Sequence, residues 1–106
     1  MPKYLFKVNL STDGLRGTLA EGGTSRREMA AKTAEAVGGR IESFYYAFGG
    51  TDAYVIGDLP NNEAAAAVAM TVSTSGTGAV ETVVLLEPEQ INTVADMTVD
   101  YEPPDG

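Results

Sequence analysis

The chain has 106 residues, of which 43% are apolar, and a formal net charge of −8. This length indicates one domain, and the apolar fraction is typical of a globular protein. Cys, His and Trp do not occur in it, which excludes disulfides, Cys/His zinc sites and any mechanism with imidazole as the base. The acidic balance argues against a nucleic-acid partner. No apolar run reaches the ~18 residues of a membrane span, and no signal peptide is evident. We therefore expect a cytoplasmic protein without membrane contact, bound metal or cofactor.

Charge is distributed unevenly along the chain. All seven basic residues lie in residues 1–40 beside four acids, a net charge of +3, whereas residues 41–106 carry eleven acids and no base. The acidic part provides solubility. The basic part either does the same or forms an isolated positive site for a small anion or for the acidic face of a partner.

The first forty residues predict one strand and two helices. Residues 3–10 alternate in polarity, which predicts a strand with one buried face. A short helix follows over residues 11–21, capped by Ser11 or Thr12. The buried face of the strand consists of Tyr4, Phe6, Val8 and Leu10.

Residues 25–28 read SRRE, which fits a capping box that opens a helix ending near Val37. Its inner stripe would contain Ala30, Thr33 and Ala34. Arg26 and Arg27 then lie in the first turn, where the helix dipole disfavours cations. This placement points to an anion or a partner, or else to an exposed pair bonded to nearby acids.

Residues 40–58 predict a β-hairpin that holds five of the eight aromatic side chains. In its first strand, alternation places Ile41 and Tyr45 on one face and Phe44 and Tyr46 on the other. In its second strand, Val55 lies opposite to Tyr54 and Ile56. Gly49 and Gly50 form the turn between the two strands.

The remaining residues predict a helix, a strand and a second helix before the C-terminus. Asn61 or Asn62 caps a helix over residues 63–74, residues 79–86 form a strand, and Pro88 opens a last helix. A hydroxyl-rich loop, residues 73–78, joins the first two of these elements. We predict one domain over residues 1–99, followed by an acidic, Pro-rich tail over residues 100–106.

The order of elements predicts an α+β, ferredoxin-like βαββαβ fold. Right-handed crossovers and short connections give a four-stranded antiparallel sheet with helices on one face and an extra C-terminal helix. A monomer would have a polar second face. The strands instead offer an additional apolar set, so we predict a homodimer with sheets packed face to face. This set comprises Leu5, Tyr45, Val55, Val83 and Leu85.

Several segments together resemble the GYD domain family of small bacterial proteins. They are MPKYL at residues 1–5, SRRE at 25–28, GGRIESFYYAFG at 38–49, PNNEAA at 60–65 and LEPEQ at 86–90. The resemblance covers about residues 1–96. In the motif that names the family, Gly49 and Asp52 match, but Thr51 stands in the place of the tyrosine. The resemblance implies a ferredoxin-like fold of the dimeric α/β-barrel kind, whose relatives include small monooxygenases and isomerases.

Three functional hypotheses follow from these residues. In the first, a cleft between sheet and helices binds a small anionic or aromatic ligand. In the second, the protein is a cofactor-independent oxygenase or isomerase, with Asp52 as base and Tyr46 or Tyr54 as proton donor; Asp52 would otherwise accept turn amides. The third is a structural or regulatory oligomer without a ligand. The candidate ligand-binding residues are Lys7, Arg26, Arg27, Tyr45 and Tyr46.

Overall fold

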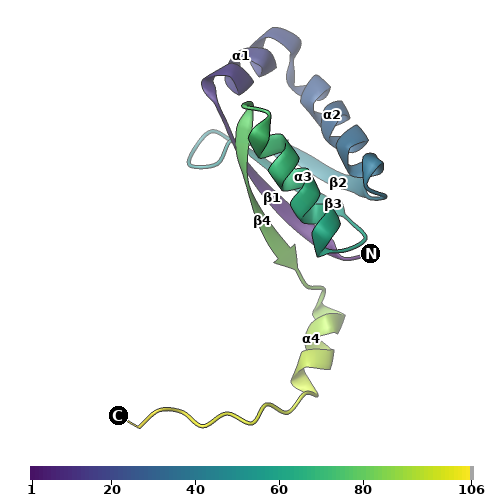
Figure 1. Cartoon of the computed structure of the whole chain (residues 1–106), viewed down its shortest axis with the longest axis vertical. Helices are drawn as coiled ribbons and strands as arrows, with labels where there is room; N and C mark the ends of the chain where they lie inside the picture. Colours follow the sequence, from purple (N-terminus) through teal and green to yellow (C-terminus); the bar gives the residue numbers. More distant parts are fainter. Residues whose placement is uncertain (106) are drawn as a thin grey trace.

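The computed structural model describes residues 1–105, which form one antiparallel sheet covered on one face by helices (Figure 1). The strand order is β2-β3-β1-β4. This arrangement confirms the predicted α+β, ferredoxin-like fold. The elements are β1 (Lys3–Leu10), α1 (Thr12–Glu21), α2 (Gly23–Ala36), β2 (Arg40–Tyr46), β3 (Ala53–Asp58), α3 (Asn62–Thr74), β4 (Gly78–Leu85) and α4 (Pro88–Ala95).

The core lies between the sheet and the helices α2 and α3, around the central strand β1. Tyr4 and Phe6 are buried on this side, as the alternation predicted. Ala34 of α2 and Ala65 of α3 pack against them in the same cluster. Small residues let both helices approach the sheet closely, and full burial of an aromatic ring such as Phe6 contributes about 1.5–3 kcal/mol.

The first helix begins as predicted, but the second does not. The Ser11 hydroxyl accepts the Gly14 backbone N–H at 3.1 Å, so Ser11 is the N-cap of α1. The predicted capping box at Ser25 is wrong, because α2 already begins at Gly23. Gly22 has φ +86°, which lets the chain turn directly from one helix into the next. Ser25 therefore lies within α2, and its hydroxyl donates to the Glu21 carboxylate.

Strand β2 does not alternate as predicted, because its pairing with β3 shifts between Ile41 and Ser43. Such a bulge places one extra residue on one strand and reverses the alternation beyond it. Ile41 and Phe44 consequently both face the helices. Val55, which pairs with Phe44, is buried on the same side. The prediction that placed Val55 on the uncovered face, and Ile41 opposite Phe44, is therefore wrong.

The C-terminal half follows the predicted order closely. The Asn61 side chain accepts the Ala64 backbone N–H at 2.9 Å and caps α3. Strand β4 spans residues 78–85, one residue earlier than predicted, and α4 begins at Pro88 as expected. Figure 1 shows α4 and the extended segment after it projecting away from the sheet at the end of β4. Within residues 1–105, every helix is too short or too polar to span a membrane.

Candidate functional site

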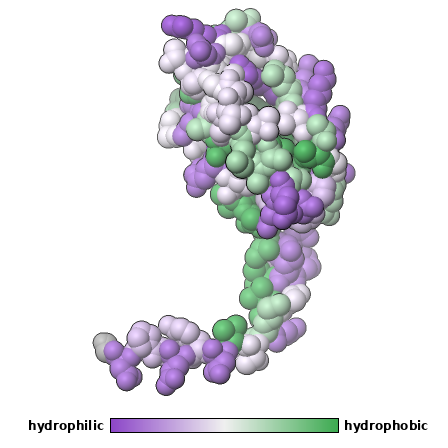
Figure 2. Space-filling view, viewed as in Figure 1, coloured by the Kyte–Doolittle hydropathy of each residue, from purple (hydrophilic) through white to green (hydrophobic). Residues whose placement is uncertain are grey.

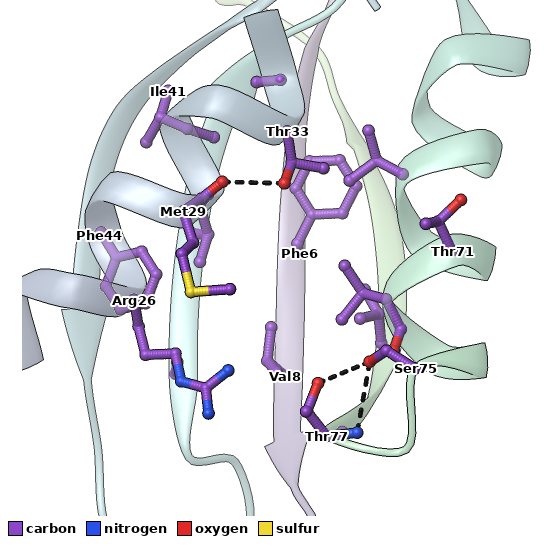
Figure 3. A pocket seen from close by; sticks show the side chains of 18 of the residues that line it. Phe6, Val8, Arg26, Met29, Thr33, Ile41, Phe44, Thr71, Ser75 and Thr77 are labelled. Atoms are coloured by element: carbon purple, nitrogen blue, oxygen red, sulfur yellow. Dashed lines mark hydrogen bonds between the residues drawn. The ribbon is translucent and has the colours of Figure 1, made fainter. Parts of the chain in front are cut away.

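A cavity of about 290 Å³ lies between the covered face of the sheet and the helices α2 and α3 (Figure 3). Most of its wall is aliphatic or aromatic, with side chains from four strands and two helices. A cavity lined in this way binds small molecules by excluding water from their apolar parts. The apolar lining includes Phe6, Val8, Met29, Ile41, Phe44 and Val68.

Arg26 is the only charged residue that lines this cavity in the described chain. It lies near the start of α2, and Figure 3 shows its guanidinium at the same end of the cavity as Ser75 and Thr77. One terminal nitrogen donates to the Gly14 carbonyl at 3.4 Å, a long hydrogen bond. The Nε of Arg26 is buried, and no residue among 1–105 accepts its hydrogen.

Two hydroxyl groups lie at the same end of the cavity, on the connection from α3 to β4. The Ser75 and Thr77 hydroxyl oxygens are 2.7 Å apart, and the Ser75 hydroxyl also donates to the Val72 carbonyl at 2.6 Å. The Ser11 backbone N–H donates to the Thr77 carbonyl at 3.0 Å, which ties this loop to the start of α1. One end of the cavity therefore offers a cation and hydroxyls, and the rest is apolar.

Tyr46 adds a polar-tipped aromatic ring to the same wall. Its hydroxyl donates to the Gly23 carbonyl at 2.9 Å, and its ring centroid is 5.1 Å from that of Phe44. Burial raises the pKa of Tyr46, and the nearby Arg26 charge opposes this shift. The phenol therefore stays protonated at neutral pH, and the bond to Gly23 fixes the ring as part of the wall.

Three other candidates lie on the opposite face of the sheet. Tyr45 and Tyr54 pair across β2 and β3, and Lys7 is the next residue in this row on β1. Tyr45 is 68% exposed. Lys7 forms a 3.7 Å ion pair with Glu81. The structure thus separates these residues from Arg26 and Tyr46 by the thickness of the sheet.

Arg27 and Asp52 also lie outside the cavity lining. Arg27 is exposed on α2, next to Arg26 in sequence. The Asp52 carboxylate accepts the Leu10 backbone N–H at 2.8 Å, while the Asp52 backbone N–H donates to the Val8 carbonyl at 2.9 Å. Asp52 therefore joins the hairpin to the end of β1 as an acceptor of backbone amides, the alternative that the sequence left open.

Sequence reasoning allowed that the hydroxyl-rich loop over residues 73–78 could hold an anion, but it did not connect this loop with Arg26. The signal was present, since residues 73–78 read STSGTG, a loop rich in hydroxyls and unhindered amides. What the sequence lacked was the position of Arg26 opposite this loop. Only the packing of α2 and α3 on the same face of the sheet brings the two together.

The uncovered face of the sheet carries a separate cluster of charges at its other end. Asp58 is buried and accepts hydrogen bonds from Lys3 at 2.9 Å and from Arg40 at 3.1 Å. Lys3 also contacts the Glu42 carboxylate. The bond from Lys3, and then that from Arg40, hold the pKa of Asp58 below its usual value, against the opposing effect of burial.

The family model of the GYD domain matches residues 4–95, from the second residue of β1 to the last residue of α4. The chain belongs to the GYD domain family. No curated protein and no solved structure matches this GYD domain. Within residues 1–105, no group of three or more acidic side chains is arranged to hold a metal ion.

Proposed function

We propose that this GYD domain binds a small amphipathic anion, a carboxylate attached to an aliphatic or aromatic body. The observation that supports this proposal is Arg26, the only charged residue among 1–105 that lines this mostly apolar cavity, whose buried Nε has no acceptor there. A buried donor without a partner costs about 1–3 kcal/mol, and more when the group is charged. A bound carboxylate would form charge-assisted hydrogen bonds with the guanidinium of Arg26.

The two ends of the cavity fit the two parts of such a ligand. The carboxylate would lie beside the guanidinium of Arg26, at the end of the cavity where Figure 3 also shows Ser75 and Thr77. The apolar body would contact the side chains of Phe6 and Met29 farther in. At about 290 Å³ the cavity is near the lower limit of small-molecule sites, about 300–1,000 Å³, so the ligand is small.

Thermal unfolding in the presence of defined probes tests this proposal. We expect octanoate and 3-phenylpropanoate to raise Tm in a concentration-dependent manner, because a ligand of the folded state stabilises by about 2.7 kcal/mol at 100 times its Kd. The uncharged control 1-octanol should raise Tm less. The Arg26→Met variant should lose the difference between octanoate and octanol, whereas Arg27→Met should keep it. Equal shifts with acid and alcohol in the wild type would contradict the role of Arg26.

We also propose that two copies pair through the uncovered faces of their sheets. Leu5, Ile56 and Val83 are neighbours across β3, β1 and β4 at the centre of this face, and all three are partly exposed. The ion pairs of Lys3 and Lys7 lie on β1 on either side of this centre. A half-exposed apolar centre with charged surroundings is the usual composition of a protein interface.

The oligomeric state of a centrally substituted variant tests this pairing. Sedimentation should show the wild type as a dimer and, at the same concentration, a larger fraction of folded 11.1 kDa monomer for Leu5→Asp. Thr98→Asp, which adds the same charge outside the sheet, is the matched control and should remain dimeric. A monomeric wild type at micromolar concentration would refute the pairing.

A further inference from the structure

Helix α4 packs on no other helix or strand among the described residues 1–105. All of its eight residues are exposed, including Ile91 at 49% and Val94 at 50%. An isolated helix shorter than about 12–15 residues is only marginally stable in water, because most helix stability in proteins comes from packing of one apolar face. Figure 2 shows hydrophobic residues along the stem that leads from the domain into this segment. The apolar face of α4 therefore needs a surface to cover it.

The helix is nevertheless part of the domain. The GYD domain match ends at residue 95, which is also the last residue of α4. Ile91, Val94 and Ala95 lie on one side of the helix at the spacing of an inward-facing stripe. A helix that belongs to the domain, has an apolar stripe and contacts none of its own core is built to pack on another molecule.

The connection to α4 directs it away from its own sheet. Glu87 is extended, with φ −75° and ψ 153°, and Pro88 after it restricts Glu87 to this region. The Glu87 backbone N–H also donates to the Gln90 side chain at 2.7 Å, which fixes the first turn of α4 to the linker. Glu87 and Pro88, held in this way, do not turn the chain back onto its own α3, and Figure 1 shows α4 pointing outward.

A groove of matching character lies between α3 and β4, with a volume of about 270 Å³. Its lining includes the small side chains of Ala65, Ala66 and Ala69, which allow another helix to approach closely. Met70, 68% exposed, and Val84, 55% exposed, form its apolar sides. No charged residue lines this groove in the described chain. The groove thus resembles the surface that an apolar helix stripe requires.

We propose that α4 of each chain packs into the groove between α3 and β4 of a second copy, with Ile91 and Val94 against Ala69 and Val84. The occupant is a second copy because the linker keeps α4 away from the groove of its own chain. A two-fold axis would make the exchange reciprocal, so that each chain covers one groove and has its own covered. This exchange is separate from the ligand cavity, which opens between α2 and α3.

Disulfide trapping tests the exchange directly, because the chain has no native cysteine. Val94→Cys in one chain and Ala69→Cys in an affinity-tagged chain should yield, on mixing and mild oxidation, a cross-linked species of twice the 11.1 kDa chain mass that contains both chains. A disulfide requires Cα atoms about 4.4–6.8 Å apart, so general proximity is insufficient. Thr93→Cys, on the opposite side of α4, is the matched control and should cross-link at least tenfold less.

Two outcomes would overturn the proposal. One is cross-linking of Thr93→Cys to Ala69→Cys as readily as that of Val94→Cys. The other is an exclusively intrachain bond in the Val94→Cys/Ala69→Cys double variant together with no product from the mixed single variants, which would place α4 on its own groove. Hydrogen exchange on the wild type provides a check that does not depend on cysteine geometry. The amides of residues 91–95 should be protected in the oligomer, and exchange at the unfolded rate would also refute the packing.

Discussion

Arg26→Met should stabilise the ligand-free protein while it weakens anion binding. Methionine keeps an unbranched, flexible chain in the cavity and removes the guanidinium. The substitution loses one 3.4 Å hydrogen bond to the Gly14 carbonyl, and such a long bond contributes less than the typical net value of about 1 kcal/mol. It also removes the buried Nε without an acceptor, whose cost is about 1–3 kcal/mol.

The difference between these effects is a gain of about 1 kcal/mol in the free energy of unfolding, which raises Tm by about 4–8 °C in a domain of this size. Thermal unfolding at a fixed protein concentration measures it, since pairing of chains would make Tm depend on concentration. Arg27→Met is the matched control, because Arg27 is exposed and surface substitutions usually change stability by less than about 0.5 kcal/mol.

The same variant should bind octanoate more weakly by about 10- to 150-fold, because a hydrogen bond to a charged group contributes about 1.5–3 kcal/mol. Calorimetric titration of wild type and variant gives this ratio. A variant that is less stable than both the wild type and Arg27→Met would refute the reasoning, since Arg26 would then serve the fold. Unchanged octanoate affinity would refute the binding role even if stability increased as expected.

Three further substitutions test other contacts. Because the folded-state pKa of Asp58 is lowered, the stability that its carboxylate contributes is fully present above its unfolded pKa of about 4 and is lost as pH falls through the folded value. Chemical denaturation at pH 7 and at pH 2 should therefore show a smaller decrease in the free energy of unfolding for Asp58→Asn than for the wild type. Gly14→Ala should destabilise by about 1–3 kcal/mol, because its Cβ would lie 2.0 Å from the Thr77 carbonyl oxygen, whereas Gly49→Ala meets no atom within 4 Å and should be nearly neutral in the same assay. Ser11→Ala should cost about 1 kcal/mol in urea unfolding through loss of the α1 cap, and an unchanged midpoint would refute that role.

Local patterns in the sequence were sufficient for the elements and their order. The alternation around Tyr4 and Phe6 predicted β1, and the side chains of Ser11 and Asn61 cap the helices that follow them. These signals involve residues within a few positions of each other, so they act before any tertiary contact exists. With short connections and right-handed crossovers, they leave few arrangements other than this sheet.

The errors arose where one segment depends on another. The bulge in β2 follows from its pairing with β3, and it moved Ile41 to the covered face against the simple alternation. The start of α2 at Gly23 depends on the turn at Gly22 that follows α1. Neither feature can be read from hydrophobic periodicity, because periodicity assumes regular elements that do not influence each other.

By itself the sequence excluded thiol and imidazole chemistry, since the chain has neither Cys nor His. It also supplied the two candidates that line the cavity, Arg26 and Tyr46, but grouped them with Lys7 and Tyr45. Alternation along the strand already placed Tyr45 and Tyr46 on opposite faces, but only the tertiary structure showed that the helices cover the face of Tyr46 and that Arg26 lies on this side. The same packing made Arg26 the only charged residue that lines the cavity among residues 1–105, and this position turns an ordinary basic residue into a candidate anion site.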